Sequence, residues 1–87
     1  MKKYFVYILK SQKILKWYIG HTNNIQRRLS EHNSGQNKST KTGVPWKLIF
    51  LREFRTNIEA NGFEIELKRT RNKDYIRSKY KEYFLDS

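Results

Sequence analysis

Alternating stretches of apolar and polar residues predict a β-hairpin at the start of the chain. Residues 3–10 are β-branched and aromatic on both faces, which is typical of a central strand. A polar turn over residues 11–16 follows, and residues 17–20 have the composition of a second, shorter strand. We therefore expect the two segments to pair as neighbours in a small sheet.

Beyond residue 23 the spacing of apolar residues becomes helical. The pattern predicts a helix over residues 24–33, which ends at Ser34 and Gly35. A polar and basic loop over residues 36–44 then leads to a third strand at 45–54, which is again apolar on both faces.

Two further helices are expected in the last third of the chain. Thr56 or Asn57 is placed to cap a helix that runs to about Arg69, and residues 72–74 begin a final helix. The order β-β-α-β-α-α predicts an α/β domain with a small three-stranded antiparallel sheet flanked by helices. Because 87 residues leave room for one hydrophobic core, we expect a single domain over residues 1–87.

The charge of the chain is strongly basic and unevenly spread. Nineteen Lys and Arg residues stand against eight Asp and Glu, and residues 1–47 hold ten of the basic residues with Glu31 as the one acid. This surplus exceeds what solubility requires, so it favours a polyanionic partner, above all nucleic acid. An anionic membrane surface ranks below nucleic acid because no stretch resembles an amphipathic membrane helix.

Composition also excludes several classes of protein. The chain has no cysteine, which rules out a disulfide framework, a thiolate zinc site and a cysteine nucleophile. The apolar run over residues 4–9 ends at Lys10 without a small-residue cleavage site, and no stretch approaches the ~20 apolar residues of a membrane span. We therefore expect a cytoplasmic protein with no membrane partner.

An arginine in the first predicted helix lies where the pattern calls for an apolar residue. Arg28 follows Ile25 by three positions and precedes Leu29, so it shares their inward side. Arg27 points away from that side and is expected to face solvent.

An acid in the second predicted helix is placed in the same way. Glu64 lies four residues after Ala60 and three before Leu67, within the inward stripe of that helix. Two interpretations stay open. Arg28 and Glu64 either pair with each other or reach water, or they open onto a shared cleft, where the carboxylate holds a hard divalent cation and the guanidinium clamps a phosphate. The basic net charge favours the second.

Aromatic and polar residues of the hairpin are candidates for the same site. Tyr7 lies in the middle of the first strand and Tyr18 opens the second, so both phenols are placed to emerge on the hairpin, although core packing is the commoner role of a lone tyrosine. His21 and Thr22 are expected just beyond the second strand, where backbone amides at the mouth of the helix favour an anion. Gly20 permits the close approach of another chain or serves the turn.

The second histidine is interpreted as structural. His32 lies on the inward side of the first helix near its end, where a hydrogen-bonded core histidine is more common than a metal ligand. A histidine-based metal cluster is not expected, because the chain has two histidines and they belong to different elements.

Together these residues resemble the GIY-YIG domain, the small nuclease module of the excinuclease C subunit and of some homing and restriction endonucleases. The likeness is greatest to the short stand-alone members, and it covers roughly residues 3–77. Phe5 stands where the first glycine of the motif is usual. The segments that carry the resemblance are Phe5-Val6-Tyr7, Tyr18-Ile19-Gly20, residues 21–33, and Glu59-Ala60 with Glu64 and Lys68.

The resemblance implies a β-β-α-β-α core plus a C-terminal helix, and a metal-dependent endonuclease that hydrolyses phosphodiester bonds. DNA is favoured over RNA as the substrate, with DNA repair as the setting, and one Mg²⁺ or Mn²⁺ ion as the cofactor. Carried over by position, the catalytic residues are Tyr7, Tyr18, His21, Arg28 and Glu64, with Glu64 as the metal ligand.

The remaining roles follow from the same resemblance and from charge. Tyr18, Tyr7 or His21 would orient or deprotonate the attacking water, and the sequence does not choose among them. Residues expected to contact the nucleic-acid backbone are Arg27, Lys38, Lys41 and Lys68, and those expected to serve the motif structurally are Gly20, Thr22 and His32. A targeting partner or a homodimer is compatible with this chain.

Two other functions compete with the nuclease. A non-catalytic basic module that binds DNA or RNA would need only the charge and exposed aromatic residues. Glu64 discriminates between the two, because a pure binder gains nothing from an acid directed at a polyanion. An adaptor that binds an acidic protein ranks last, since no residue singles it out.

Overall fold

The segment that is apolar on both faces forms the central strand of a three-stranded sheet. In the computed structural model, which describes residues 2–86, β1 (Tyr4–Ser11) lies between β2 (Trp17–Thr22) and β3 (Trp46–Phe54). Both pairings are antiparallel, and they place Tyr7 opposite Gly20 on one side and Leu51 on the other. The predicted sheet is confirmed.

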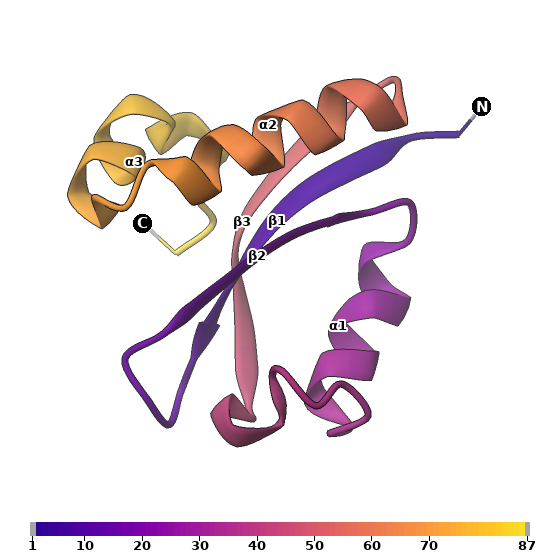
Figure 1. Ribbon diagram of the computed structural model, residues 1–87, viewed down its shortest axis with the longest axis vertical. Helices are drawn as coiled ribbons and strands as arrows, with labels where there is room; N and C mark the ends of the chain where they lie inside the picture. The colour runs from indigo at the N-terminus through magenta and orange to yellow at the C-terminus, as the bar shows by residue number, and fades with distance from the viewer. Residues whose placement is uncertain (1, 87) are drawn as a thin grey trace.

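Helices cover the two faces of this sheet. Figure 1 shows α1 (Ile25–Asn33) on one side and α2 (Asn57–Arg69) across the other, followed by the short α3 (Lys73–Lys79). Short 3₁₀ turns at Lys41–Gly43 and Lys81–Tyr83 complete the described elements. The α/β class and the expected order of elements are confirmed. None of the helices in the described part of the chain has the length and apolar content to cross a bilayer.

Alternation along β1 produces two cores, one on each face. Val6 and Ile8 pack toward α2, whereas Tyr7 and Leu9 pack on the other face with residues of α1. All four side chains are at most 1% exposed. This double burial explains why the strand is apolar at successive positions rather than at every second one.

The junction between β2 and α1 differs from the prediction. Pairing with β1 continues to Thr22, so His21 and Thr22 lie inside the strand and not at the mouth of the helix. The side chain that caps α1 is Asn24, whose Oδ1 accepts from the backbone N–H of Arg27 at 3.1 Å. The ladder extends because β1 is long enough to pair with both residues. His21 therefore projects toward α2 instead of toward the start of α1.

Candidate active site

Arg28 faces the sheet from α1 and is fixed by two acceptors. Its Nε donates to the hydroxyl oxygen of Tyr7 at 3.4 Å, and its NH1 donates to Oε1 of Glu31 at 3.1 Å. The Arg28 side chain is 35% exposed, against 63% for Arg27. The predicted difference between the two arginines is thus present, and one edge of the Arg28 guanidinium stays open to solvent.

Tyr7 does not emerge on the hairpin, contrary to one of the two expectations for it. The residue is 1% exposed because it lies in the central strand beneath α1, and its hydroxyl meets Nε2 of His32 at 3.1 Å. Gly20 makes room for this ring, since a Cβ at that position would lie 2.7 Å from the Tyr7 hydroxyl oxygen. Gly20 thus serves an internal contact. Tyr18 is the half-buried phenol of the pair, with its ring centroid 4.7 Å from that of His32.

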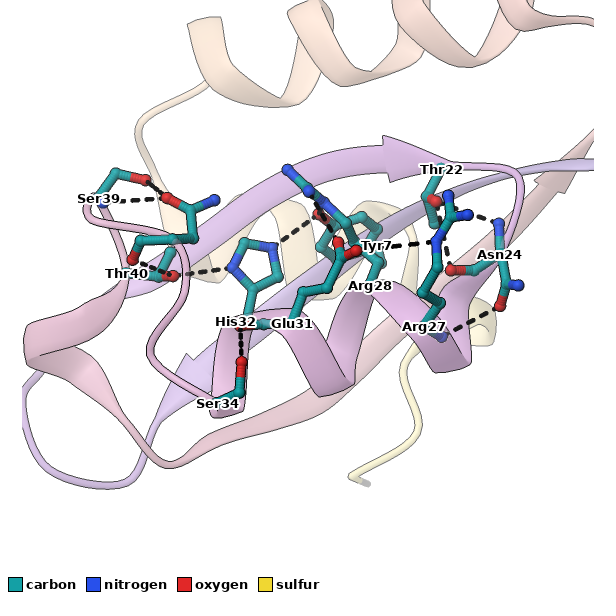
Figure 2. A network of polar contacts seen from close by, with 11 residues as sticks. Tyr7, Thr22, Asn24, Arg27, Arg28, Glu31, His32, Ser34, Ser39 and Thr40 are labelled. Atoms are coloured by element: carbon teal, nitrogen blue, oxygen red, sulfur yellow. Dashed lines mark hydrogen bonds and ion pairs between the residues drawn. The ribbon is translucent and has the colours of Figure 1, made fainter.

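A chain of hydrogen bonds connects Arg28 to the loop after α1 (Figure 2). In every bond the donor lies on the Arg28 side and the acceptor on the loop side. The Thr40 hydroxyl donates to the carbonyl of Asn37 at 3.4 Å, so its oxygen accepts from Nδ1–H of His32 at 2.9 Å. Nε2 of His32 is then the acceptor for the Tyr7 hydroxyl proton. The Tyr7 oxygen in turn presents a lone pair to Nε of Arg28. The Arg28 guanidinium can only donate, so Tyr7 donates in turn to His32 and the remaining ring proton lies on Nδ1, where Thr40 accepts it.

Burial sets the protonation of the two inner groups of this chain. It raises the pKa of Tyr7 to about 12, and the hydrogen bond from Arg28 opposes this rise. Burial, followed by the charge of Arg28, lowers the pKa of His32. Both groups are therefore neutral near pH 7, as the chain of hydrogen bonds requires.

Glu64 is held on the opposite side of β2 by two basic groups. Its side chain is 13% exposed, its Oε1 lies 2.5 Å from Nδ1 of His21, and its Oε2 lies 2.6 Å from Nζ of Lys68. The other ring nitrogen of His21 meets Oδ1 of Asn57 at 3.0 Å. Arg28 and Glu64 thus have different partners, which removes the interpretation in which they pair with each other.

The Glu64 carboxylate can serve as the single protein ligand of a hard divalent cation. An ionised carboxylate offers about four lone-pair sites, and the contacts to His21 and Lys68 use two of them. Mg²⁺ commonly keeps several waters and binds through one or two carboxylates together with substrate phosphate. Within residues 2–86 no cluster of three or more His, Cys, Asp or Glu side chains is present, so a cation enclosed entirely by protein ligands does not fit.

The candidate residues form two groups on opposite faces of the sheet. Tyr18 belongs to the core on the α1 face, whereas His21 follows the opposite alternation and faces α2. The structure therefore shows two half-sites, one on each face of the sheet, in place of the single cleft that was expected.

The other predicted residues lie around these half-sites. Lys38 and Lys41 are exposed and belong to the same loop as Asn37. Asn37 and Arg28 are among the residues that line a hollow of about 320 Å³. The Thr22 hydroxyl accepts from the backbone N–H of Asn24, a local structural contact. Sequence reasoning missed Thr40, because a threonine within a polar loop carries no signal, and it missed the contact between His21 and Asn57.

Comparison with known proteins gives a consistent family. The sequence model of the GIY-YIG catalytic domain matches residues 3–81. The UPF0213 protein YazA of Bacillus subtilis is 40% identical over 80 residues, covering 87% of this chain and 80% of that protein. The UPF0213 protein lin0209 of Listeria innocua is 37% identical over 83 residues, covering 92% of this chain and 91% of that protein. The solution NMR structure of the UPF0213 protein BH0048 from Bacillus halodurans aligns with a TM-score of 0.53 at 30% identity, covering 86% of this chain and 80% of that one.

Proposed function

Because the chain belongs to the GIY-YIG catalytic domain family, a family of nucleases, we propose that it is a metal-dependent endonuclease that hydrolyses phosphodiester bonds, with DNA favoured over RNA. The observation that carries the proposal is the placement of Glu64. In a protein of net charge +11, this acid is largely buried and is fixed by His21 and Lys68. A module that only binds a polyanion has no use for such a carboxylate.

Glu64 supports the proposal as the ligand of the metal. Mg²⁺ or Mn²⁺ bound there would supply polarisation of the scissile phosphate and stabilisation of the leaving oxygen. His21 and Lys68 hold the two carboxylate oxygens in place before substrate arrives, so little reorganisation is needed.

Arg28 is suited to the charge that develops on the phosphate. A guanidinium carries five N–H donors, and the contacts to Tyr7 and Glu31 use two. The remaining donors can bind the non-bridging oxygens, in the geometry that an arginine offers to phosphate. Because its Nε and NH1 are already fixed, Arg28 stabilises the transition state without a large loss of side-chain entropy.

Tyr7 has a positioning role in this scheme. A pKa of about 12 keeps its proton in place near neutral pH, which supports its contact with His32 and disfavours it as the base. Both ring nitrogens of His21 face oxygen acceptors, on Glu64 and on Asn57, so the ring has no free lone pair for a proton. Tyr18 is then the candidate for orienting or deprotonating the attacking water.

Replacing Thr40 with valine is expected to change the tautomer of His32 and to lower kcat by about tenfold, with KM little affected. Valine cannot accept the Nδ1–H bond, so the neutral ring shifts its proton to Nε2, and Tyr7 loses the acceptor for its hydroxyl. The ¹⁵N chemical shifts of the His32 ring report the tautomer directly, independently of activity. Thr40→Ser should restore both properties, and Thr42→Val, at an exposed position of the same loop, is the matched control. A wild-type tautomer in Thr40→Val would contradict this role.

The proposed activity is tested by adding the purified protein to plasmid, single-stranded and branched DNA and to RNA. We expect cleavage of DNA with Mg²⁺ or Mn²⁺ and none after chelation by EDTA, since Glu64 alone cannot polarise the phosphate. Gel electrophoresis of the products measures the result. Tight binding without cleavage of any substrate would instead favour the non-catalytic binding module.

A further inference from the structure

A basic groove lies beside Glu64, between β2 and the end of α2. It has a volume of about 430 Å³, within the roughly 300–1000 Å³ usual for ligand sites. Lys16 and Trp17 line it from the hairpin side, and Lys68, Arg71 and Lys73 line it from the region of α2 and α3. Four of its described lining residues are basic and none is acidic.

Protein stability does not account for this clustering of positive charge. Lys16, Arg71 and Lys73 have no carboxylate partner within residues 2–86, and like charges around one hollow repel each other. Nζ of Lys73 lies 5.1 Å from the centroid of the Trp17 ring, a cation–π contact that holds the ammonium at the groove. Unpaired cations in a hollow are complementary to an anionic ligand.

The walls of the groove also fit the apolar parts of a nucleic acid. The exposed Leu15 and the half-buried Ile19 contribute aliphatic surface, and Trp17 contributes aromatic surface. Proteins that follow a nucleic-acid backbone combine such surface with a row of cations, because the sugars and bases contact the apolar part and the phosphates contact the charges.

The groove adjoins the half of the candidate active site that contains Glu64. Lys68 lines the groove, and its Nζ also lies 2.6 Å from Oε2 of Glu64. We infer that this groove binds the sugar-phosphate backbone of the substrate strand next to the scissile phosphate. The placement of the scissile phosphate next to the groove rests on the proposed function. The binding of a nucleic-acid backbone by the groove is independent of that function.

The test compares two variants that lose the same charge. One combines Lys16→Ala, Arg71→Ala and Lys73→Ala, all at exposed positions of the groove. The matched control combines Lys2→Ala, Lys47→Ala and Lys81→Ala, which are exposed and lie outside the groove. Binding to fluorescent single-stranded and duplex DNA and to RNA is measured against salt concentration with EDTA present, so that no cleavage occurs.

The groove variant is expected to bind at least about tenfold more weakly than wild type, with the slope of log K against log salt reduced by about two to three. The control variant should keep most of the slope, and the nucleic acid that shows the larger difference identifies the preferred backbone. Equal losses in the two variants, an unchanged slope in the groove variant, or no binding by the wild-type protein would overturn the inference.

A second measurement uses the two tryptophans. On titration with a short oligothymidylate, the indole N–H resonance of Trp17 should shift, whereas that of Trp46, which is 4% exposed, should not. A shift of Trp46 alone, or of neither, contradicts the inference. Both measurements are made without divalent metal, so they test binding separately from cleavage. If the groove binds as expected but the protein cleaves no substrate in the assay with Mg²⁺ or Mn²⁺, the endonuclease proposal is refuted and the groove assignment stands.

Discussion

Glutamine in place of Glu64 is expected to lower the rate of metal-dependent DNA cleavage by about a thousandfold or more. Metal polarisation of a phosphate is worth several kcal/mol, and each ~1.4 kcal/mol corresponds to a factor of ten in rate. Glutamine keeps the size of the side chain, but it removes the charge that attracts the cation. The largely buried position means that few other acids can take over.

Initial rates at saturating DNA, measured over a range of Mg²⁺ concentrations, give the effect on cleavage. Binding of DNA in EDTA should be unchanged or tighter, because the variant has one negative charge fewer. Glu66→Gln is the matched control on the same helix. Glu66 is exposed and accepts from the Tyr80 hydroxyl at 2.6 Å, a bond that glutamine can keep. Full cleavage by Glu64→Gln would remove this residue from the mechanism.

Lysine in place of Arg28 is expected to lower kcat by about a hundred- to a thousandfold, the usual effect of losing a preorganised donor to a developing charge. An ammonium keeps the positive charge, but it cannot contact Tyr7 and Glu31 and still present a planar pair of donors to a phosphate. The loss should therefore appear in kcat much more than in DNA affinity.

Arg27→Lys provides the comparison for this prediction. Arg27 is 63% exposed and contacts only Glu31 among its carboxylate neighbours in residues 2–86, at 3.9 Å. A lysine there retains the charge that meets the DNA backbone, so kcat and binding should stay close to wild type. Steady-state kinetics of both variants decide the matter, and similar values for the two would show that the side of α1 facing the sheet has no special role.

The fold was predictable from the sequence because each element depends on short-range spacing. A strand that is buried on both faces must be apolar at successive positions, as β1 is, and a helix repeats its buried face every three or four residues. The same periodicity identified Arg28 and Glu64, because a charge on a buried face stands out against Ile25, Leu29, Ala60 and Leu67. Where the prediction was wrong, at the end of β2, the outcome depended on how far β1 could pair with it.

The contacts of the site depended on packing between elements distant in sequence. The burial of Tyr7 follows from the position of α1 over the central strand and from the absence of a side chain at Gly20. The hydrogen bonds from His32 to Thr40 and from Tyr7 to His32, and the contact of His21 with Glu64, join residues 8, 25 and 43 positions apart. Periodicity determines which face of its own element a residue occupies. It contains no information about which atom of another element comes within hydrogen-bond distance, and only the tertiary structure decided that.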